Sequence, residues 1–347
     1  MPHCLIGLGS NLGNRREIIE EALAKLRRLP GIQVLGVSSF RETAPIGGPA
    51  DQPPYLNAAA LIDSSLQPRD LLALLQQIET EAGRRRKETW GPRTLDLDLL
   101  LYGELVLSTP TLTLPHPRMA WRRFVLEPAA EVAGQMRHPL IGWTVAGLLE
   151  HLNTALPYVA VAGPIAAGKT HLARLLCDKT SARLISEAID EQSLEIFYAD
   201  PAGHAWTMEL EFLHKRTDLL AVDSAAWSER RPAVSDFWFD QSPAFAQAWL
   251  SESQRPAFFE RWQEARQNVV QPKLIVLLDA PAETLMDRIR RRGRRGEEFL
   301  SPEKIARIRQ SIIDQASQPG LGPVLKISGA DIRSALTETL AAMQAMQ

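Results

Sequence analysis

The segment YVAVAGPIAAGKT, residues 158–170, decides the fold of the second half of the chain. Its first five residues are apolar, as in a buried strand, and GPIAAGKT (163–170) matches the pattern G-x-x-x-x-G-K-[ST]. An amphipathic helix is predicted to follow over Lys169–Asp178. A strand, a glycine loop and a helix in this order predict a phosphate-binding loop at the end of a sheet strand.

The residues of this loop have separate expected roles. Gly163 and Gly168 let backbone N–H groups converge on a phosphate at the helix N-terminus. Lys169 is expected to reach the β and γ phosphate oxygens, and the Thr170 hydroxyl is expected to bind Mg²⁺. The segment therefore predicts binding of a nucleoside triphosphate such as ATP.

The rest of this half alternates between apolar strands and helices without hairpin turns. Strands are predicted at Arg183–Ile185, Ala233–Phe237, Leu274–Asp279 and Val324–Ser328, and a helix at Ala282–Arg292. Strands that are joined by helical crossovers form a parallel sheet. We therefore expect an α/β P-loop kinase domain with a doubly wound parallel sheet.

A domain boundary is predicted near Leu156 and Pro157. The 347 residues suggest two domains, and proline neither continues the preceding amphipathic helix nor donates to a sheet. We assign residues 1–156 to the first domain and residues 157–347 to the second.

The bulk composition limits the classes of function. A formal net charge of -2 argues against a nucleic-acid partner, and no apolar run approaches 18 residues, which argues against a membrane span. Cys4 and Cys177, each in an apolar stretch, predict buried free thiols in a reducing compartment. The first residues lack a secretory pattern. These features predict a cytoplasmic protein.

The first half also alternates between strands and helices. Strands are predicted at His3–Leu8, Ile32–Phe40, Tyr55–Ile62 and Thr94–Tyr102, and helices at Arg15–Arg28 and Pro68–Ala82. This order predicts an α/β sandwich of ferredoxin-like size.

Two acidic residues interrupt the last of these strands, GPRTLDLDLLLYG (91–103). Asp96 and Asp98 share one face because strand side chains alternate with period two. The pair fits either the solvated face of an edge strand or a Mg²⁺ site, since Mg²⁺ uses one or two carboxylates together with water and phosphate.

The segment before this strand is basic. Arg84, Arg85, Arg86, Lys87 and Arg93 flank Trp90. Such a run is compatible with a solvated loop, but next to a metal–carboxylate pair it favours a polyphosphate between the two. A loop of this kind is also expected to be mobile and to close over ATP.

Four stretches resemble the 6-hydroxymethyl-7,8-dihydropterin pyrophosphokinase family of folate synthesis. They are GLGSNLGNR (7–15), TAPIGGPADQPPYLNAA (43–59), WGPRTLDLDLL (90–100) and LPHPRMAWRRFVLEPAAEV (114–132). The resemblance covers about residues 3–155 and implies transfer of pyrophosphate from ATP to the pterin hydroxymethyl group with release of AMP.

The resemblance also implies roles for single residues. Asp96 and Asp98 would hold two Mg²⁺ ions. Arg84, Arg86 and Arg93 would surround the triphosphate, and His116 and Arg122 would contact ATP. The pterin would lie among Thr43, Pro45, Tyr55, Asn57, Trp90 and Phe124, where aromatic faces and an amide suit a flat ring. The basic loop is one residue shorter than the family pattern, which leaves the role of each arginine in it open.

Three further features of the second half bear on a kinase site. Glu187 follows a strand and suits either a general base, a substrate-hydroxyl ligand or a helix N-cap. Asp236 ends the next strand and is a candidate Mg²⁺ ligand through water. The cluster from Arg288 to Arg295 suits a lid over the phosphates, or a basic helix end on the surface.

These markers, over residues 158–316, resemble the deoxynucleoside kinase family. The resemblance implies 5′-phosphorylation of a deoxynucleoside with Glu187 as base and with the lid arginines Arg288, Arg292 and Arg294. It also makes a homodimer through this domain plausible. The sequence departs from the family where Phe237 follows Asp236 and where Thr207 takes the place of a base-reading glutamine.

Three functions are consistent with the whole sequence. The preferred one is a bifunctional enzyme with both kinase activities. The second half could instead be a nucleotide-binding module for regulation or dimerisation, or a kinase for another small molecule. Lys169, Thr170 and Glu187 favour catalysis, and the missing glutamine leaves the preferred nucleoside open.

Overall fold

A computed structural model describes residues 1–49, 51–83, 91–187, 190–229, 231–329 and 331–347. The chain divides into two compact units, Met1–Thr154 with Ala341–Gln347, and Ala155–Leu340. The last seven residues, which we assigned to the second domain, thus group with the first unit. Within that unit, Arg123 Nε donates to the carbonyl of Met346 over 3.4 Å.

The first unit contains a five-stranded sheet, a two-stranded sheet and four α-helices among its described residues up to Thr154. Its strands are β1 His3–Ser10, β2 Ile32–Val37, β3 Arg41–Thr43, β4 Tyr55–Ser64, β5 Asp96–Tyr102, β6 Leu107–Ser108 and β7 Thr113–Leu114. Its helices are α1 Arg15–Arg28, α2 Pro68–Glu81, η1 Met119–Trp121, α3 Arg123–Ala133 and α4 Val145–Thr154.

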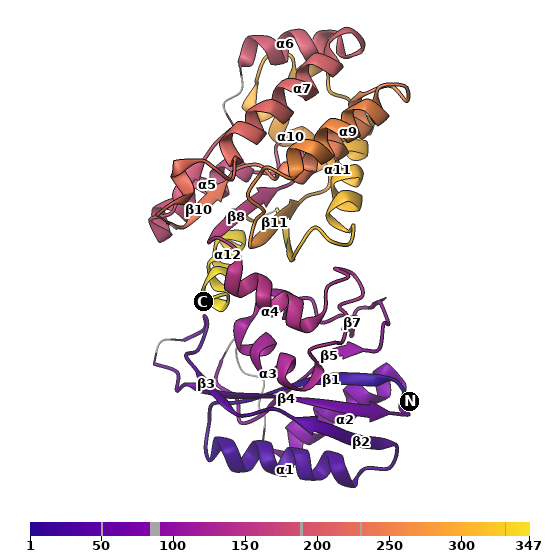
Figure 1. The fold of residues 1–347 in the computed structure, drawn as a ribbon, viewed down its shortest axis with the longest axis vertical. Helices are drawn as coiled ribbons and strands as arrows, with labels where there is room; N and C mark the ends of the chain where they lie inside the picture. The colour runs from indigo at the N-terminus through magenta and orange to yellow at the C-terminus, as the bar shows by residue number, and fades with distance from the viewer. Residues whose placement is uncertain (50, 84–90, 188–189, 230, 330) are drawn as a thin grey trace. The chain divides into compact units, whose positions relative to one another are not determined.

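The main sheet of this unit has the antiparallel order β2-β4-β1-β5, and β3 pairs antiparallel with the first residues of β4. One core joins α1 and α2 to one sheet face through side chains such as Leu23, Leu75, Leu97 and Leu99. Helix α3 lies on the other face (Figure 1). The ferredoxin-like α/β prediction is confirmed. The strand expected at 32–40 ends earlier, at Val37 as β2, and a short strand that was not predicted, β3, follows at Arg41–Thr43.

The second unit is built from five strands and their helical connections. Its strands are β8 Tyr158–Ala162, β9 Arg183–Ile185, β10 Ala233–Ser235, β11 Leu274–Asp279 and β12 Val324–Ser328. The elements between them are α5 Lys169–Thr180, α6 Glu191–Ala199, α7 Pro201–Leu220, η2 Ala225–Trp227, η3 Phe239–Gln241, α8 Ser242–Trp249, α9 Arg255–Arg266, α10 Ala282–Arg292, η4 Glu297–Phe299 and α11 Pro302–Ala316, and the chain ends with α12 Ile332–Ala345.

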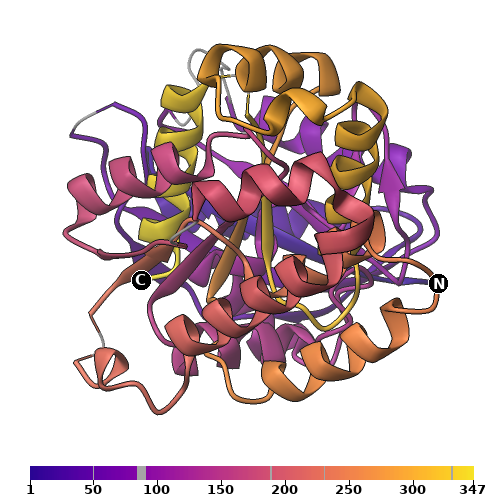
Figure 2. The same cartoon turned by 90° about the horizontal axis from the view of Figure 1, so that it is seen from above.

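The sheet of the second unit is parallel throughout, in the order β12-β11-β8-β10-β9. The first strand, β8, lies at the centre. The chain then crosses to β9 at one edge and returns to β10 between β9 and β8, before β11 and β12 extend the sheet on the other side. Helices cover both faces (Figures 1 and 2). This is the doubly wound sheet that the sequence predicts, and the loop after β8 lies where ligands bind in such sheets.

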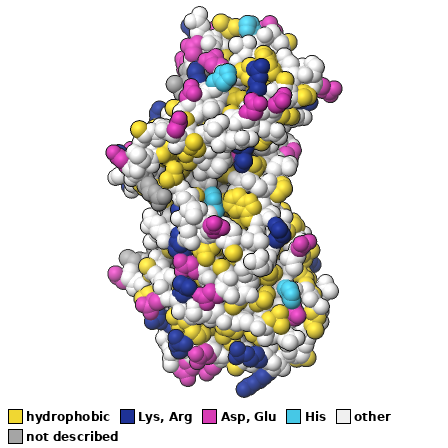
Figure 3. Space-filling model, in the orientation of Figure 1, with side chains coloured by type: hydrophobic (Ala, Val, Ile, Leu, Met, Phe, Trp, Pro, Cys, Tyr) yellow, Lys and Arg dark blue, Asp and Glu magenta, His cyan; other side chains and the backbone are white. Residues whose placement is uncertain are grey.

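The burial of the two cysteines agrees only in part with the sequence prediction. Cys4 and Cys177 are both free, but Cys177 is half-buried rather than buried because it lies toward the solvent side of α5. Acidic and basic side chains are interspersed on the face shown in Figure 3. Among the described residues, every helix is too short or too polar to cross a membrane.

Candidate active sites

In the first unit, the two aspartates lie opposite glycines of the neighbouring strand. Asp96 pairs with Gly9 and Asp98 with Gly7. On its other side, Gly9 pairs with Asn57 of β4. A Cβ atom on Gly9 would lie 3.2 Å from Asn57 Oδ1 and 3.9 Å from Asp96 Cβ. The missing side chains leave a narrow strip of bare backbone between the carboxylates and the amide.

Arg93 holds one of the two carboxylates. Its Nη1 donates to Asp96 Oδ2 over 2.6 Å. Burial opposes the charge on Arg93, but attraction by Asp96, Tyr55 and Asp98 outweighs it and raises the pKa of the guanidinium. Asp98 forms no hydrogen bond or ion pair with described residues. Asp98 is therefore the carboxylate that is free to bind a cation, while Asp96 is oriented by Arg93.

Two more predicted residues converge on this face. The backbone N–H of His116 donates to the carbonyl of Leu100 over 2.8 Å, where the β1–β5 register shifts. Burial, together with Arg122 and Arg118, lowers the pKa of His116 to about 3, so its ring is neutral. Its Nδ1 accepts from the backbone of Arg118, which leaves Nε2 to donate to a ligand.

Asp98 is the carboxylate that most strongly favours the charged form of Arg122. Burial lowers the pKa of Arg122 to about 10, while Asp98 and Asp96 favour its charged form. Its guanidinium carbon lies 5.5 Å from the centre of the Phe124 ring. At neutral pH Arg122 is thus a buried cation beside two carboxylates, which suits a site where an anionic ligand and a cation meet.

The predicted pterin residues lie on β3, β4 and the following segments. Asn57 Nδ2 donates to Thr43 Oγ1 over 2.8 Å, and Tyr55 Oη donates to the carbonyl of Gly91 over 3.2 Å. Pro45 is half-buried just after β3. Arg84, Arg86 and Trp90 lie outside the described residues, so their predicted roles stay predictions.

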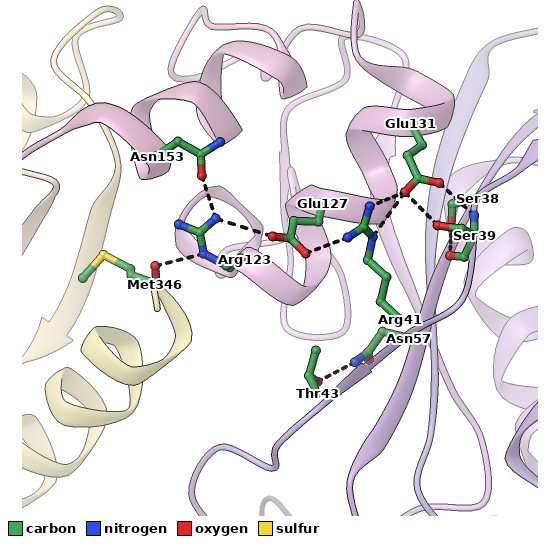
Figure 4. Close-up of polar contacts among 10 residues, drawn as sticks. All are labelled: Ser38, Ser39, Arg41, Thr43, Asn57, Arg123, Glu127, Glu131, Asn153 and Met346. Carbon is green, nitrogen blue, oxygen red and sulfur yellow. Dashed lines mark hydrogen bonds and ion pairs between the residues drawn. The ribbon is translucent and has the colours of Figure 1, made fainter.

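Helix α3 fixes the strand that carries Thr43. Arg41 on β3 donates to Glu131 over 2.7 Å and to Glu127 over 3.3 Å, and both acids lie on α3 (Figure 4). Glu131 also accepts from Ser39. These side chains are partly exposed, so we ascribe to them the placement of β3 rather than much stability.

The sequence analysis did not single out Asn11 as a positioning residue. Asn11 is 1% exposed, accepts from the backbone N–H of Arg93 over 2.7 Å and donates to the carbonyl of Pro53 over 3.2 Å. Its own N–H donates to the carbonyl of Arg93 over 3.0 Å. An amide in the motif GSNLG was a visible signal, because asparagine can bridge two backbone segments at once.

The donor set of this unit fits Mg²⁺. Among the described residues no group of three or more His, Cys, Asp or Glu is gathered for a metal. Two carboxylates with room for water and phosphate oxygens are the usual protein share of a magnesium site. Asp96 and Asp98 would hold such an ion, and the ion would neutralise the negative charge of the phosphates.

In the second unit, the loop after β8 has the predicted geometry. Gly163 has φ 146°, and a Cβ atom there would lie 2.5 Å from the carbonyl oxygen of Leu278. Gly168 has φ 99° and leads into α5. Lys169 Nζ donates to the carbonyls of Gly163 and Pro164 over 2.9 Å each. Burial lowers the pKa of Lys169 to about 8, although Glu187 and Asp236 favour its charged form.

Asp236 organises the end of the sheet. Its Oδ2 accepts from Thr170 Oγ1 over 2.8 Å and from Ser186 Oγ over 2.9 Å, and its Oδ1 accepts from the backbone of Glu187 over 3.0 Å. The two predicted metal-binding residues, Thr170 and Asp236, are thus in contact. A hydroxyl and a carboxylate at a phosphate loop fit a Mg²⁺ ion bound partly through water.

Glu187 and a buried arginine face the same pocket. Arg216 on α7 donates from Nε to Glu187 Oε1 over 2.6 Å and from Nη2 to Oε2 over 3.2 Å. Its Nη1 donates to Ser242 Oγ over 2.8 Å. The pair fixes the carboxylate in one orientation. Glu187 is not the N-cap of α6, because Asp190 occupies that position.

The pocket has a volume of about 290 Å³. Its polar lining residues include Lys169, Thr170, Glu187 and Asp236, and Asp236 contacts both Thr170 and Glu187. Its flat or apolar lining residues are Leu194, Phe197, Tyr198, Phe212, Phe245 and Trp249. A pocket lined by both polar groups and aromatic rings suits a ring that carries a hydroxyl group.

The predicted lid arginines differ in position. Arg292 and Arg294 line the pocket, and Arg292 is held by the buried carboxylate of Glu297. Arg288 does not line the pocket. It instead donates to the carbonyls of Ala166, Ala167 and Gly329 behind the phosphate loop, because those oxygens face α10.

Helix α7 places a different side chain in the pocket from the one that we predicted at the base-recognition position. Thr207, which we placed at the position of the base-reading glutamine, is exposed and does not line the pocket. Two residues later, Glu209 is 2% exposed and lines it. The sequence offered a signal, since Glu209 and Arg216 are seven residues apart and therefore on one helix face.

Glu209 gives a pH-dependent prediction for stability. Burial raises the pKa of Glu209 to about 8 from the ordinary value of 4.5, with Arg216 opposing and Glu187 adding to the rise. Protonation therefore supports folding below pH 4.5, and this support is lost as the pH rises toward 8. Glu209→Gln should stabilise the second unit by about 1–3 kcal/mol at pH 8 and by less at pH 5.

Thermal unfolding of the full chain at pH 5 and pH 8 measures this effect. Glu211→Gln is the matched control, because Glu211 lies on the same helix, is partly exposed and pairs with Lys215 over 2.6 Å. An equal change at both pH values would show that Glu209 is not the group that titrates.

The first unit thus has basic side chains beside a carboxylate pair, and the second has basic side chains beside a phosphate loop. Both arrangements suit the binding of nucleotide polyphosphates. The family model described as 7,8-dihydro-6-hydroxymethylpterin-pyrophosphokinase matches residues 5–134, and the model described as deoxynucleoside kinase matches residues 159–339. The chain belongs to both families, to the first through its N-terminal unit and to the second through its C-terminal unit.

Curated relatives match the N-terminal part. A 2-amino-4-hydroxy-6-hydroxymethyldihydropteridine pyrophosphokinase of Pseudomonas aeruginosa is 49% identical over 134 residues, 39% of this chain and 82% of that protein. The protein of the same name from Bacillus subtilis is 48% identical over 131 residues, 38% of this chain and 78% of that protein. A solved structure of deoxyadenosine kinase from M. mycoides with bound dCTP aligns with TM-score 0.47 and 15% identity, over 52% of this chain and 96% of that one.

Proposed function

We propose that the N-terminal unit transfers pyrophosphate from ATP to 6-hydroxymethyl-7,8-dihydropterin in folate synthesis, with release of AMP. The observation that carries this is the carboxylate pair on β5 beside Arg93 and Arg122. Two Mg²⁺ ions at Asp96 and Asp98 would neutralise the triphosphate. His116 and Arg122 would bind ATP, and Asn57 with Thr43 would bind the pterin edge.

We also propose that the C-terminal unit phosphorylates the 5′-hydroxyl of a deoxynucleoside with ATP. Glu187 lines the pocket beside Asp236, which accepts a hydrogen bond from Thr170 over 2.8 Å and one from the backbone of Glu187 over 3.0 Å. Glu187 would accept the proton of the hydroxyl, while Lys169, Arg292 and Arg294 would bind phosphate oxygens. Catalysis by this unit is favoured over a purely regulatory role because base, lysine and metal-binding hydroxyl line one pocket.

Product analysis of the purified chain tests both activities. With ATP, Mg²⁺ and hydroxymethyl-dihydropterin we expect AMP, and ADP as the product would contradict pyrophosphoryl transfer. With deoxynucleosides we expect ADP and a monophosphate, both lost in Lys169→Ala. If ATP binds but no acceptor is phosphorylated, the second unit is a regulatory module. A cytoplasmic location and a homodimer through this unit complete the proposal, and fractionation and gel filtration test them.

A further inference from the structure

Glu209 is a buried acid in the pocket that the proposed phosphoryl transfer does not use. It lies on α7, and its Oε2 is buried without a hydrogen-bond partner among the described residues. The nearest cation in sequence on this face, Arg216, already donates to Glu187 and Ser242. Leaving a buried carboxyl unsatisfied costs stability, which indicates that its partner is a ligand.

A second polar side chain of the same pocket is also unsatisfied. Gln241 is 1% exposed, lines the pocket, and its Oε1 has no hydrogen-bond partner within the described ranges. The same pocket is lined by the rings of Phe197, Phe212 and Trp249. A planar ring with polar groups on its edge would stack on these faces and satisfy both side chains at once.

The chemistry of a carboxylate selects the edge of that ring. An ionised carboxyl has two acceptor oxygens and no donor, whereas a glutamine amide has one acceptor and two donor hydrogens. Guanine presents a ring N–H next to an amino group, two adjacent donors. Adenine and cytosine present an amino donor beside an acceptor nitrogen, an edge that an amide fits and a carboxylate does not.

We propose that Glu209 accepts two hydrogen bonds from a 2-amino-4-oxopyrimidine edge, so that the pocket selects a guanine deoxynucleoside. Gln241 Oε1 would then accept the second hydrogen of the 2-amino group. The proposal rests on the proposed kinase function of this pocket and specifies its acceptor. A pterin carries the same edge and is the other possible source of it.

The protonation state of Glu209 agrees with this choice. The charged groups that act on it are Arg216, which favours ionisation, and Glu187, which opposes it. Burial leaves the empty pocket with a largely neutral acid at pH 7. Two N–H donors from a ligand favour the carboxylate form. If Glu209 were instead neutral in the complex, its carboxyl group would offer one donor and one acceptor, as an amide does. Glu209→Gln would then change the affinity for the ligand little.

The test measures dissociation constants by calorimetry with the full chain at pH 8. The ligands are deoxyguanosine, deoxyadenosine, deoxycytidine, thymidine and hydroxymethylpterin, and initial rates of phosphorylation are measured in parallel. We expect deoxyguanosine to bind about 10- to 100-fold more tightly than deoxyadenosine or deoxycytidine. Glu209→Gln should remove this preference, and Glu211→Gln should keep it.

Each outcome has a defined meaning. A preference for adenine or cytosine, or deoxyguanosine affinity within twofold of wild type in Glu209→Gln, overturns the edge assignment and leaves water as the partner of Glu209. Glu209-dependent binding without any monophosphate keeps the edge assignment and rejects the kinase. Phosphorylation that is independent of Glu209 keeps the kinase and rejects the edge assignment. If pterin binding also depends on Glu209, the ratio of the two affinities identifies the source of the edge.

Discussion

Asp98→Asn is expected to lower the kcat of pyrophosphoryl transfer by about 10³-fold, because a carboxylate that neutralises phosphate charge through a metal contributes several kcal/mol to the transition state. Asn keeps the size of the side chain but loses its charge. Asp98 forms no hydrogen bond or ion pair with described residues, and Asp96 still favours the charged form of Arg122 after Asp98 is neutralised. The fold should therefore survive the exchange.

The measurement is AMP formation as a function of Mg²⁺ concentration. The variant should need more Mg²⁺ and should stay slow at saturation. Asp70→Asn serves as control, since Asp70 is exposed on α2, the helix packed on the opposite face of the sheet. Activity of Asp98→Asn within tenfold of wild type at saturating Mg²⁺ would reject Asp98 as a metal ligand.

Asp96→Asn should behave differently from Asp98→Asn, because Asp96 also holds Arg93 over 2.6 Å. Its loss frees a half-buried guanidinium whose charge Asp96 now stabilises. We therefore expect a weaker affinity for ATP in addition to the lower kcat. The comparison separates the carboxylate that only binds a cation from the one that also orients an arginine.

Local sequence patterns predicted the strands and the phosphate loop well. The period-two placement of Asp96 and Asp98 and the apolar run before Gly163 depend only on neighbouring residues, and the structure has β5 and β8 there. The expected strand over residues 32–40 was wrong in its length. β2 ends at Val37 because the side-chain Oγ of Ser38, and not a backbone carbonyl, accepts from the N–H of Ala59, and β3 starts at Arg41.

The parts that sequence analysis missed depend on packing between distant segments. Arg216 and Glu209 reach the pocket because α7 lies beside it, although they are at least 22 residues from Glu187 and about 40 from Lys169 in the chain. Thr207 was chosen by its place in a motif, but the face of the helix decides which side chain is buried. Asn11 likewise acts through Arg93, 82 residues away.

Glu187→Gln is expected to lower the kcat of nucleoside phosphorylation by about 10²–10⁴-fold, the usual range for loss of a general base. Gln has the same length but cannot accept the hydroxyl proton. The affinity for ATP should change little, because Lys169 and Thr170 are unaltered. Single-turnover rates and the dissociation constant of ATP measure the two effects separately.

The exchange also weakens a buried ion pair, since Arg216 is 4% exposed and donates to both oxygens of Glu187. Breaking such a pair costs about 3–5 kcal/mol, so a loss of activity could reflect unfolding. Glu187→Asp keeps the charge beside Arg216 but moves the carboxylate away from the substrate. A folded, ATP-binding Glu187→Asp protein that is as slow as Glu187→Gln would assign the loss to proton transfer, whereas full activity of Glu187→Gln would show that another group accepts the proton.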